Sequence, residues 1–464
     1  MNNLLSMPAS ELVQRLCSHE CRVTEVVQES LDSIHRLDPA LGAFISVDSD
    51  GALSRAKQLD GHTGECGPLH GLPFAIKDVT DVKGLTTTFG SRLSAKGPAQ
   101  SDALSVARLK AAGAVIVGKT NTPEYAFGAV CTNLIRGTTC NPWDTALTSA
   151  GSSGGSAVAV TSGMVSLAQG TDLGGSVRTP AAFTGCVGFR PTLGRIPEPQ
   201  SLLGWERIAT QGVLARSIAD ARLMATVMSG NDARDPLAFG DREHECESLP
   251  KRFHAAASLT LGGEYDVDGE VAQRFSRAID KASEIMDVDE DHPQAGGASQ
   301  AFCTLSYAQT WYEFRHLLEA HPELATEPFK WNVAQGEGVS LESYLSAQEE
   351  RTRFYRELQH FFERYDLLMV PSASVMPFRN DSGEVATVGG RPTRRITDYL
   401  ECTYLFSLAG FPSVSLPAPK MPDELPFGIQ LIARPCHEDL LFSACALLES
   451  EAGFVHQWPP MCLD

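Results

Sequence analysis

Short apolar runs alternate along the chain with stretches in which apolar residues recur every three or four positions. Such an alternation of buried strands and amphipathic helices is typical of an α/β fold. Residues 101–120 give a clear example, because Ser101 and Asp102 can cap a helix whose apolar residues fall on one face. Gly113 ends this predicted helix, and residues 114–117 then read as a strand in the middle of a sheet.

The same pattern continues towards the C-terminus. It predicts a short strand at 165–168, a glycine-rich turn at 170–175 and a helix that Pro180 begins. Late buried strands are predicted at 367–370 and 428–432. No internal repeat and no linker divides the chain.

Two regions differ from this regular pattern. Residues 245–300 have few strand signals, and we interpret their acidic run as a solvated helix end or surface insertion rather than an interaction tail; it comprises Asp287, Asp289, Glu290 and Asp291. A predicted helix that follows is rich in aromatic residues, namely Tyr307, Trp311, Tyr312 and Phe314. These rings can pack in the core or line a pocket, and the sequence favours neither.

Composition narrows the class of protein. Of 464 residues, 43% are hydrophobic and 20% charged, which excludes a disordered or fibrous chain. The net charge of −19 argues against a nucleic-acid or anionic-membrane partner, because phosphates are bound by clustered Lys and Arg. The twelve cysteines include no CxxC pair, so we expect reduced thiols and no metal site. No signal peptide begins the sequence and no apolar run reaches the roughly 18 residues of a membrane span, so we expect a cytoplasmic protein.

One short motif suggests a nucleotide hydrolase. Residues 113–120, GAVIVGKT, match the Walker A pattern. That pattern binds phosphates only when the residues between its glycines form a loop, whereas here residues 114–117 belong in a buried strand. We therefore expect the match to be accidental.

A second motif suggests an esterase. Residues 151–155 match the G-x-S-x-G nucleophile elbow of α/β-hydrolases, which would make Ser153 the nucleophile and His437 or His456 its base. An elbow follows directly on a strand, and the turn-rich residues 141–150 predict none. This hypothesis stays as an alternative.

The most specific constellation spans residues 150–192 and contains two Gly/Ser stretches separated by a predicted helix and strand. In the second stretch, Gly174 and Gly175 precede Ser176. Successive backbone amides can then turn towards one point, as an oxyanion hole requires. A serine beside its own oxyanion donors suits acyl transfer.

A nucleophilic serine also needs a base, and Lys77 is the candidate. It ends a predicted buried strand at 73–76 and therefore points inward. It can simply pair with Asp78, or its burial can lower its pKa from about 10.4 towards 7–8, which would let the neutral amine accept a proton.

With these residues in view, the sequence resembles the amidase signature family, serine hydrolases that use a Ser–cis-Ser–Lys triad. The signature matches almost continuously over 150–192, and further blocks match at 67–91 and 102–124. The segments TTCNPWD, QGVLARSIADA and LPFGIQLIARPCHEDLLFSACALLE match as well. The resemblance covers residues from about 23 to about 450, apart from about 245–300.

The resemblance implies an α/β fold with a mixed, twisted sheet surrounded by helices. It implies a single domain over residues 1–464, with a signature core at about 67–192 and a variable surface segment at about 245–300. It also implies a hydrolase of carboxylic amides that uses neither cofactor nor metal, with carbamates or aryl esters as further substrates.

Roles follow from the resemblance residue by residue. It makes Ser176 the nucleophile, Ser152 the bridging serine on a cis peptide bond, and Lys77 the final base. The oxyanion donors that it implies are the main-chain amides of Leu173, Gly174 and Gly175, with that of Ser176. We expect residues 125–131, Trp205 and the aromatic residues of 302–314 to contribute to the acyl pocket.

The sequence departs from the family pattern at two places. Ser149 and Ala150 stand where the common form has Pro-Gly, which bears on how the bridging loop is held. Thr179 follows Arg178 where the A-type subunits of tRNA-dependent amidotransferases commonly have Gln. Arg178 and Asp172 flank the turn, and we interpret them as a structural ion pair.

Thr179 and the acidic net charge count against an A-type amidotransferase subunit, which stays as an alternative to an amidase together with the Ser153 esterase. For the amidase we expect a small-molecule amide substrate, no nucleic-acid or membrane partner, and a monomer or homodimer.

Overall fold

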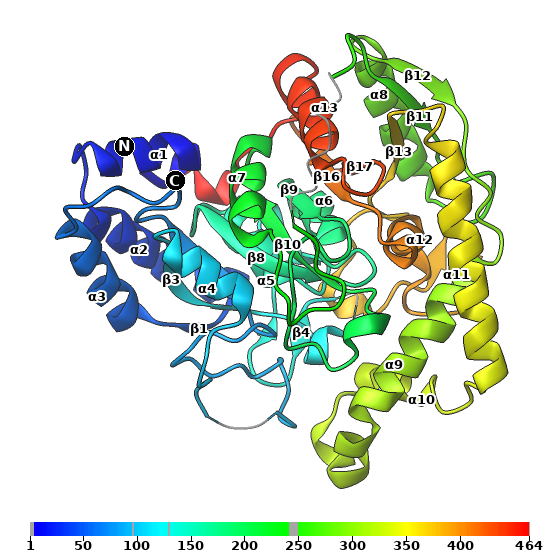
Figure 1. The fold of residues 1–464 in the computed structure, drawn as a ribbon, viewed down its shortest axis with the longest axis horizontal. Coiled ribbons are helices and arrows are strands. Elements are labelled where there is room, and N and C mark those ends of the chain that lie inside the picture. The colour runs from blue at the N-terminus through cyan, green and yellow to red at the C-terminus, as the bar shows by residue number, and fades with distance from the viewer. Residues whose placement is uncertain (1–3, 95–96, 129, 241–248, 464) are drawn as a thin grey trace.

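The computed structural model describes residues 4–94, 97–128, 130–240 and 249–463, and its centre is one sheet of eleven strands (Figure 1). In spatial order the strands are β1 (Phe44–Val47), β3 (Val115–Thr120), β2 (Pro73–Lys77), β8 (Leu167–Asp172), β10 (Thr210–Ala215), β9 (Val187–Arg190), β16 (Ser413–Pro417), β17 (Gly428–Ile432), β13 (Leu367–Pro371), β11 (His254–Ala257) and β12 (Asp287–Glu290). β2 runs parallel to β3 and β8, and β11 runs parallel to β12 and β13, whereas the other neighbours are antiparallel. The mixed sheet that the resemblance implies is confirmed.

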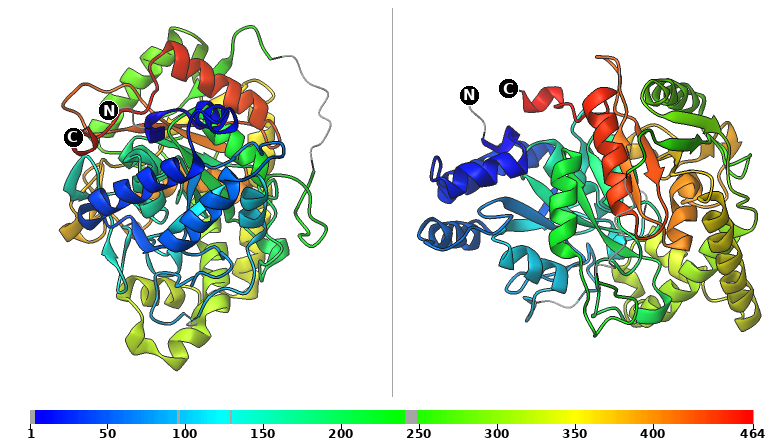
Figure 2. Two further views of the ribbon diagram at one scale, coloured as in Figure 1. Left: turned by 90° about the vertical axis from the view of Figure 1, so that its left-hand side faces the viewer. Right: turned by 45° about the horizontal axis from the view of Figure 1, so that its top comes forward.

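Thirteen α-helices in the described chain surround this sheet (Figures 1 and 2). They are α1 (Ala9–Cys17), α2 (Val23–Leu41), α3 (Ser49–Asp60), α4 (Leu104–Ala111), α5 (Gly154–Thr161), α6 (Arg178–Thr184), α7 (Ile218–Met228), α8 (Gly269–Ser283), α9 (Ala298–Ala320), α10 (Glu327–Ala334), α11 (Leu341–Phe361), α12 (Glu401–Ala409) and α13 (Glu438–Glu451). Helices α7 and α13 pack on each other and on β10 and β16, and α5 and α6 likewise pack on each other and on the central strands. Within the described residues, none of the helices is long and apolar enough to cross a membrane.

The predicted strands are present, with some shifts in their ends. β17 spans 428–432 as predicted, and β13 includes all of 367–370. β8 begins later than 165–168 and runs on through Gly170, because β10 pairs with it there through Gly212. Gly170 therefore lies in a strand, and the turn begins only after Asp172.

Two predicted helix starts are wrong. Helix α4 begins at Leu104, and the side chain of Asp102 does not cap it but accepts hydrogen bonds from the Lys83 amide (2.7 Å) and from Nζ of Lys110 (2.7 Å). Helix α6 begins at Arg178, so Pro180 is its third residue.

Two segments without predicted strands do contain them. The acidic run is not the helix end or surface insertion that we expected, because its residues Asp287, Asp289 and Glu290 lie in edge strand β12, which pairs in parallel with β11. Their charged side chains reach solvent from a sheet edge. The segment 245–300 also contains helix α8, while its residues 245–248 lie outside the described residues. Residues 144–148 form strand β7 (Asp144–Thr148), which pairs with β6 (Cys140–Asn141).

Candidate active site

The turn that presents Ser176 joins strand β8 to helix α6. β8 ends at Asp172, and residues 173–176 turn before the chain enters the helix. Gly175 has φ +118°, and a Cβ at this residue would collide with Oγ1 of Thr403 on α12. Only glycine fits here, which explains one of the two glycines of the motif.

A buried carboxylate, that of Asp172, holds the turn in place. It accepts hydrogen bonds from the main-chain N–H groups of Gly175 (2.8 Å) and Val177 (3.1 Å). Arg178 donates to it from Nε (3.0 Å) and Nη2 (2.8 Å), and Arg190 lies 3.4 Å away. Burial raises the pKa of Asp172, but Arg178, Arg190 and the hydrogen bonds outweigh burial and hold the pKa below its ordinary value. The expected ion pair is present, and it braces the turn.

The amides of this turn face in different directions. The Gly175 N–H donates to Asp172, which departs from the expectation that it faces a substrate oxygen. The N–H groups of Leu173, Gly174 and Ser176 have no acceptor within the described part of the chain.

Replacing Asp172 by asparagine is expected to lower the free energy of unfolding by about 3–5 kcal/mol, since two buried guanidinium groups then lose their counter-charge. Urea denaturation of the purified variant measures this change. Asp381→Asn is the matched control, because Asp381 and Arg379 form an exposed ion pair, and its unfolding midpoint should hardly move. A midpoint for Asp172→Asn equal to that of the control would contradict the bracing role.

Lys77 is the last residue of β2, and its amine contacts both serines of the bridging loop. Nζ donates to Oγ of Ser152 at 2.6 Å, to Oγ of Ser153 at 3.0 Å and to Oγ1 of Thr171 at 2.9 Å. The Lys77 main-chain N–H donates to Oε1 of Gln169 at 3.0 Å, which fixes the strand end beside β8. Three hydroxyl groups thus hold the amine in one position.

Burial changes the acidity of this amine. The Lys77 side chain is fully buried, and burial lowers its pKa from 10.5 to about 7, against smaller opposing effects of Cys131 and Asp172. Asp78, the partner that the sequence left open, pairs instead with Lys119 at 3.1 Å. An amine with a pKa near neutrality can accept a proton at physiological pH.

The bridging loop and the Ser176 turn are joined through the backbone. The peptide bond between Gly151 and Ser152 is cis. Directly after it, the Ser153 N–H donates to the main-chain oxygen of Ser176 at 3.0 Å. This main-chain hydrogen bond links the bridging loop to the Ser176 turn.

The departures from the family pattern are accommodated locally. Oγ of Ser149 donates to the main-chain oxygen of Thr139 at 3.0 Å, and the Ala150 N–H donates to Oγ1 of Thr148 at 3.1 Å. Ala150 has φ +60°, in the left-handed region that favours glycine, where the common pattern has one. Thr179 donates from Oγ1 to the oxygen of Ser372 at 3.0 Å.

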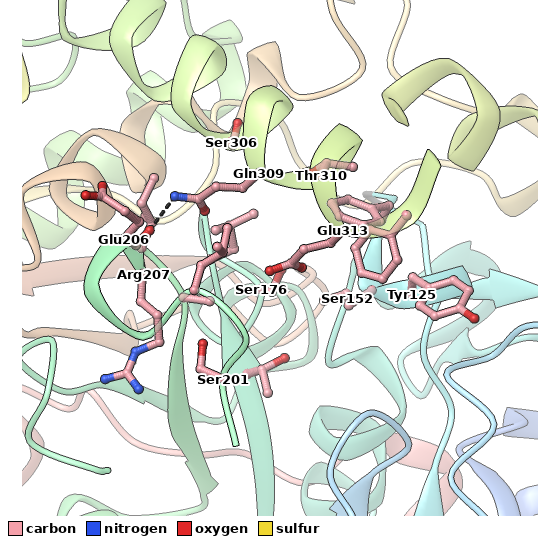
Figure 3. A pocket seen from close by; sticks show the side chains of 18 of the residues that line it. Tyr125, Ser152, Ser176, Ser201, Glu206, Arg207, Ser306, Gln309, Thr310 and Glu313 are labelled. Atoms are coloured by element: carbon pink, nitrogen blue, oxygen red, sulfur yellow. Dashed lines mark hydrogen bonds between the residues drawn. The ribbon is translucent and has the colours of Figure 1, made fainter. Parts of the chain in front are cut away.

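A pocket of about 230 Å³ opens over the two serines (Figure 3). Ser152, Ser176, Thr171 and Leu173 contribute to its lining, and loop and helix residues form the opposite walls. Those walls contain Tyr125, Ala126, Phe127, Glu198, Ser201, Leu203, Glu206, Arg207, Ile208, Ala209, Ser306, Gln309, Thr310, Glu313 and Phe314. A small molecule in this pocket can reach Ser176 directly.

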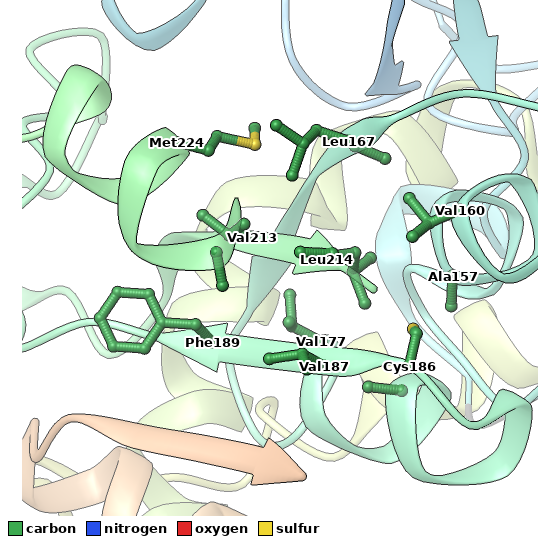
Figure 4. Packing of buried hydrophobic residues seen from close by; sticks show 14 of the residues in the cluster. Ala157, Val160, Leu167, Val177, Cys186, Val187, Phe189, Val213, Leu214 and Met224 are labelled. Atoms are coloured by element: carbon green, nitrogen blue, oxygen red, sulfur yellow. The ribbon is translucent and has the colours of Figure 1, made fainter. Parts of the chain in front are cut away.

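Behind the pocket the turn is anchored in the hydrophobic core. Val177 follows Ser176 and is fully buried in one cluster with Ala157 of α5, Val187 of β9 and Val213 of β10 (Figure 4). Because protein cores are close-packed, this contact limits movement of the Ser176 turn.

The geometry is less favourable to the nucleotide hydrolase and the Ser153 esterase that the two short motifs suggest. Residues 115–120 form the buried strand β3, as expected for an accidental Walker A match. The prediction that no strand precedes the G-x-S-x-G motif was wrong, because β7 precedes residues 151–155. The Ser153 side chain, however, is fully buried. Nδ1 of His456 contacts the Gly185 oxygen at 2.9 Å, and Nδ1 of His437 that of Pro435 at 3.0 Å.

The predicted pocket lining is correct only in part. Tyr125, Phe127 and Phe314 line the pocket, whereas Trp205 is 73% exposed. The other lining residues of the predicted aromatic helix α9 are polar, and composition gave no signal for them. Thr171 was missed too, because a threonine inside a strand has no distinctive sequence pattern.

A cis-linked serine beside a buried lysine and a glycine-framed second serine defines the class of amidase-signature enzymes. The chain belongs to the Amidase family, whose family model matches residues 25–442.

Relatives that are named as the A-type subunit of glutamyl-tRNA(Gln) amidotransferase are similar over almost the full length. That of Streptomyces coelicolor is 31% identical over 99% of this chain and 98% of its own, and that of Symbiobacterium thermophilum is 32% identical over 92% and 93%. Among solved structures, a bacterial aryl acylamidase of the amidase signature family matches with a TM-score of 0.88 and 26% identity over 98% of both chains. A 6-aminohexanoate cyclic dimer hydrolase matches with a TM-score of 0.87 and 25% identity over 99% of both chains.

Proposed function

We propose that this protein hydrolyses the C–N bond of a small carboxylic amide through an acyl-enzyme on Ser176. The observation that supports this most directly is the 2.6 Å hydrogen bond between Nζ of Lys77 and Oγ of Ser152, because Ser152 lines the same pocket as Ser176. The position of Lys77 and its pKa both suit a general base, because the amine that contacts Ser152 also has a pKa of about 7.

In the proposed acylation, the neutral amine of Lys77 takes a proton from Oγ of Ser152, which takes one from Oγ of Ser176. Oγ of Ser176 then bonds to the amide carbon, and the carbonyl π electrons move to its oxygen. When the oxygen reforms the double bond, the C–N bond breaks and the proton returns through Ser152 to the leaving nitrogen. The products are an amine and an ester on Ser176.

The developing oxyanion needs preorganised donors. We assign the main-chain N–H groups of Leu173, Gly174 and Ser176, which have no acceptor within the described residues. Gly175 serves the same purpose indirectly, since its N–H orients the turn through Asp172. Water activated by the same relay then attacks the acyl carbon and releases the acid.

The experiment is hydrolysis of 4-nitroacetanilide by the purified chain alone. We expect nitroaniline and acetate in equal amounts with no added metal, nucleotide or second protein. Carbamates and aryl esters are expected to react through the same serine, because each presents an acyl carbon with a leaving group. No release of the corresponding amine from any member of a panel of anilides and aliphatic amides would contradict the proposal.

A second candidate is the A-type subunit of an amidotransferase, which the names of the relatives from Streptomyces coelicolor and Symbiobacterium thermophilum favour. Such a subunit would release ammonia from glutamine for a reaction on another subunit. It would co-purify with that partner and hydrolyse glutamine faster in its presence. The net charge of −19 disfavours a role at a tRNA surface.

A further inference from the structure

We propose that the substrate bears a cationic ammonium or guanidinium group and that Glu313 binds it; this inference rests on the proposed function. Glu313 lies on α9 and lines the same pocket as Ser176. Its carboxylate extends from the helix into the pocket, on the side where Ser176 lies (Figure 3).

The position of Glu313 follows from the periodicity of α9. The residues of this helix that line the pocket follow the pattern i, i+3, i+4, i+7, i+8 and so share one face, namely Ser306, Gln309, Thr310, Glu313 and Phe314. Glu313 is thus fixed on a rigid element and turned towards the pocket, unlike an acidic side chain at a free surface.

Glu313 differs from the other two carboxylates of the pocket in lacking a partner. Glu206 accepts hydrogen bonds from Gln348 and from the hydroxyl of Tyr344, the latter at 3.2 Å. Glu198 accepts one from Gln211 and lies 3.9 Å from Nε of Arg207. Within the described ranges, the Glu313 carboxylate has neither a hydrogen-bond nor an ion-pair partner.

Among the described residues that line the pocket, Arg207 is the one cation, and its hydrogen bonds go to groups other than Glu313. Arg207 donates from Nη1 to Oδ2 of Asp235 at 2.8 Å and to the main-chain oxygen of Glu198 at 3.1 Å. In Figure 3 its guanidinium points away from Glu313. The pocket therefore has an unbalanced negative charge.

Burial makes that charge costly while the pocket is empty. Glu313 is half-buried, and burial raises its pKa above the ordinary value with no neighbouring charge or donor to oppose it within the described chain. A cation that enters the pocket restores the missing partner, and a charge-assisted hydrogen bond in such a site is stronger than a neutral one.

The neighbouring wall suits the rest of such a substrate. Tyr125, Phe127 and Phe314 line the pocket beside Glu313, with ring centroids 4.9 Å apart for Tyr125–Phe314 and 5.7 Å for Phe127–Phe314. Aromatic faces attract cations and pack against methylene groups. An amide with a short apolar spacer and a terminal ammonium or guanidinium group matches both features.

The test compares kcat/KM for cationic and neutral anilides of equal length. One series has the ammonium group on the acyl chain and the other has it on the aniline. For wild-type protein we expect at least one cationic series to be favoured over its neutral match by about 10- to 100-fold. Glu313→Gln should bring this ratio close to one, and Glu313→Lys should favour carboxylate-bearing anilides instead.

Glu319→Gln is the matched control, because Glu319 is an exposed residue of the same helix, and it should keep the wild-type ratio. The inference is overturned if neither cationic series is favoured, or if Glu313→Gln keeps the preference. If no anilide is hydrolysed at all, the proposed function fails. Calorimetric binding of the same anilides to Ser176→Ala protein then still decides whether Glu313 selects cations.

Discussion

Ser176→Ala protein is expected to lose anilide hydrolysis by about 10⁴-fold or more in kcat, with its fold intact. The loss is large because the variant has no atom that can form the acyl-enzyme, so Lys77 and Ser152 have no proton to relay. The side chain projects into the pocket from the turn, and its removal disturbs neither Asp172 nor the core around Val177. Single-turnover and steady-state release of nitroaniline measure the effect.

The matched control for this variant is Ser201→Ala. Ser201 lines the same pocket but has no part in the relay, so its removal should change kcat by only a few-fold. If Ser176→Ala retained most of its activity while Ser153→Ala lost it, the esterase hypothesis would replace acyl transfer through Ser176.

Lys77→Met is expected to lower kcat by about 10²- to 10⁴-fold, the usual contribution of a general base. Methionine occupies a similar volume in this buried position but cannot accept a proton from Oγ of Ser152. The far-ultraviolet circular dichroism of the variant should match that of wild type, which separates loss of the base from loss of the fold.

The same residue sets the expected pH dependence. In the proposed mechanism the neutral amine is the active form, so kcat/KM of wild type should rise with pH through about 7 and level off above it. Below that pH the amine is protonated and cannot take the proton of Ser152. A profile that is flat between pH 5 and 9, or one that falls with rising pH, would contradict the role of Lys77.

The sequence was most informative where a backbone requirement restricts residue type. Gly174 and Gly175 could be singled out because they directly precede Ser176, and the structure supplies the reason for Gly175 in its φ and its close approach to Thr403. Ser152, Ser176 and Lys77 became candidates through the motifs that surround them. β13 was predicted from an apolar run, and β17 from a mainly apolar stretch that Gln430 interrupts.

Features that depend on distant contacts could not be predicted in this way. In the sequence, the residues of β12 look like a solvated charge run. They form a strand because they pair with β11, a contact that their own side chains do not indicate. Arg190 braces Asp172 from a strand that follows in sequence only after α6. Glu313 gave no signal, because an acidic residue on a helix usually faces solvent, and only the packing of α9 turns it to the pocket.

The most direct test of acyl transfer through Ser176 is to quench the enzyme with acid during turnover of an activated acyl substrate, such as 4-nitrophenyl acetate, and to map its peptides by mass spectrometry. We predict one acetyl group per chain, located on Ser176 and absent from Ser176→Ala protein. An acetyl group on Ser153 instead, or turnover with no acylated serine under conditions of burst release, would contradict this mechanism.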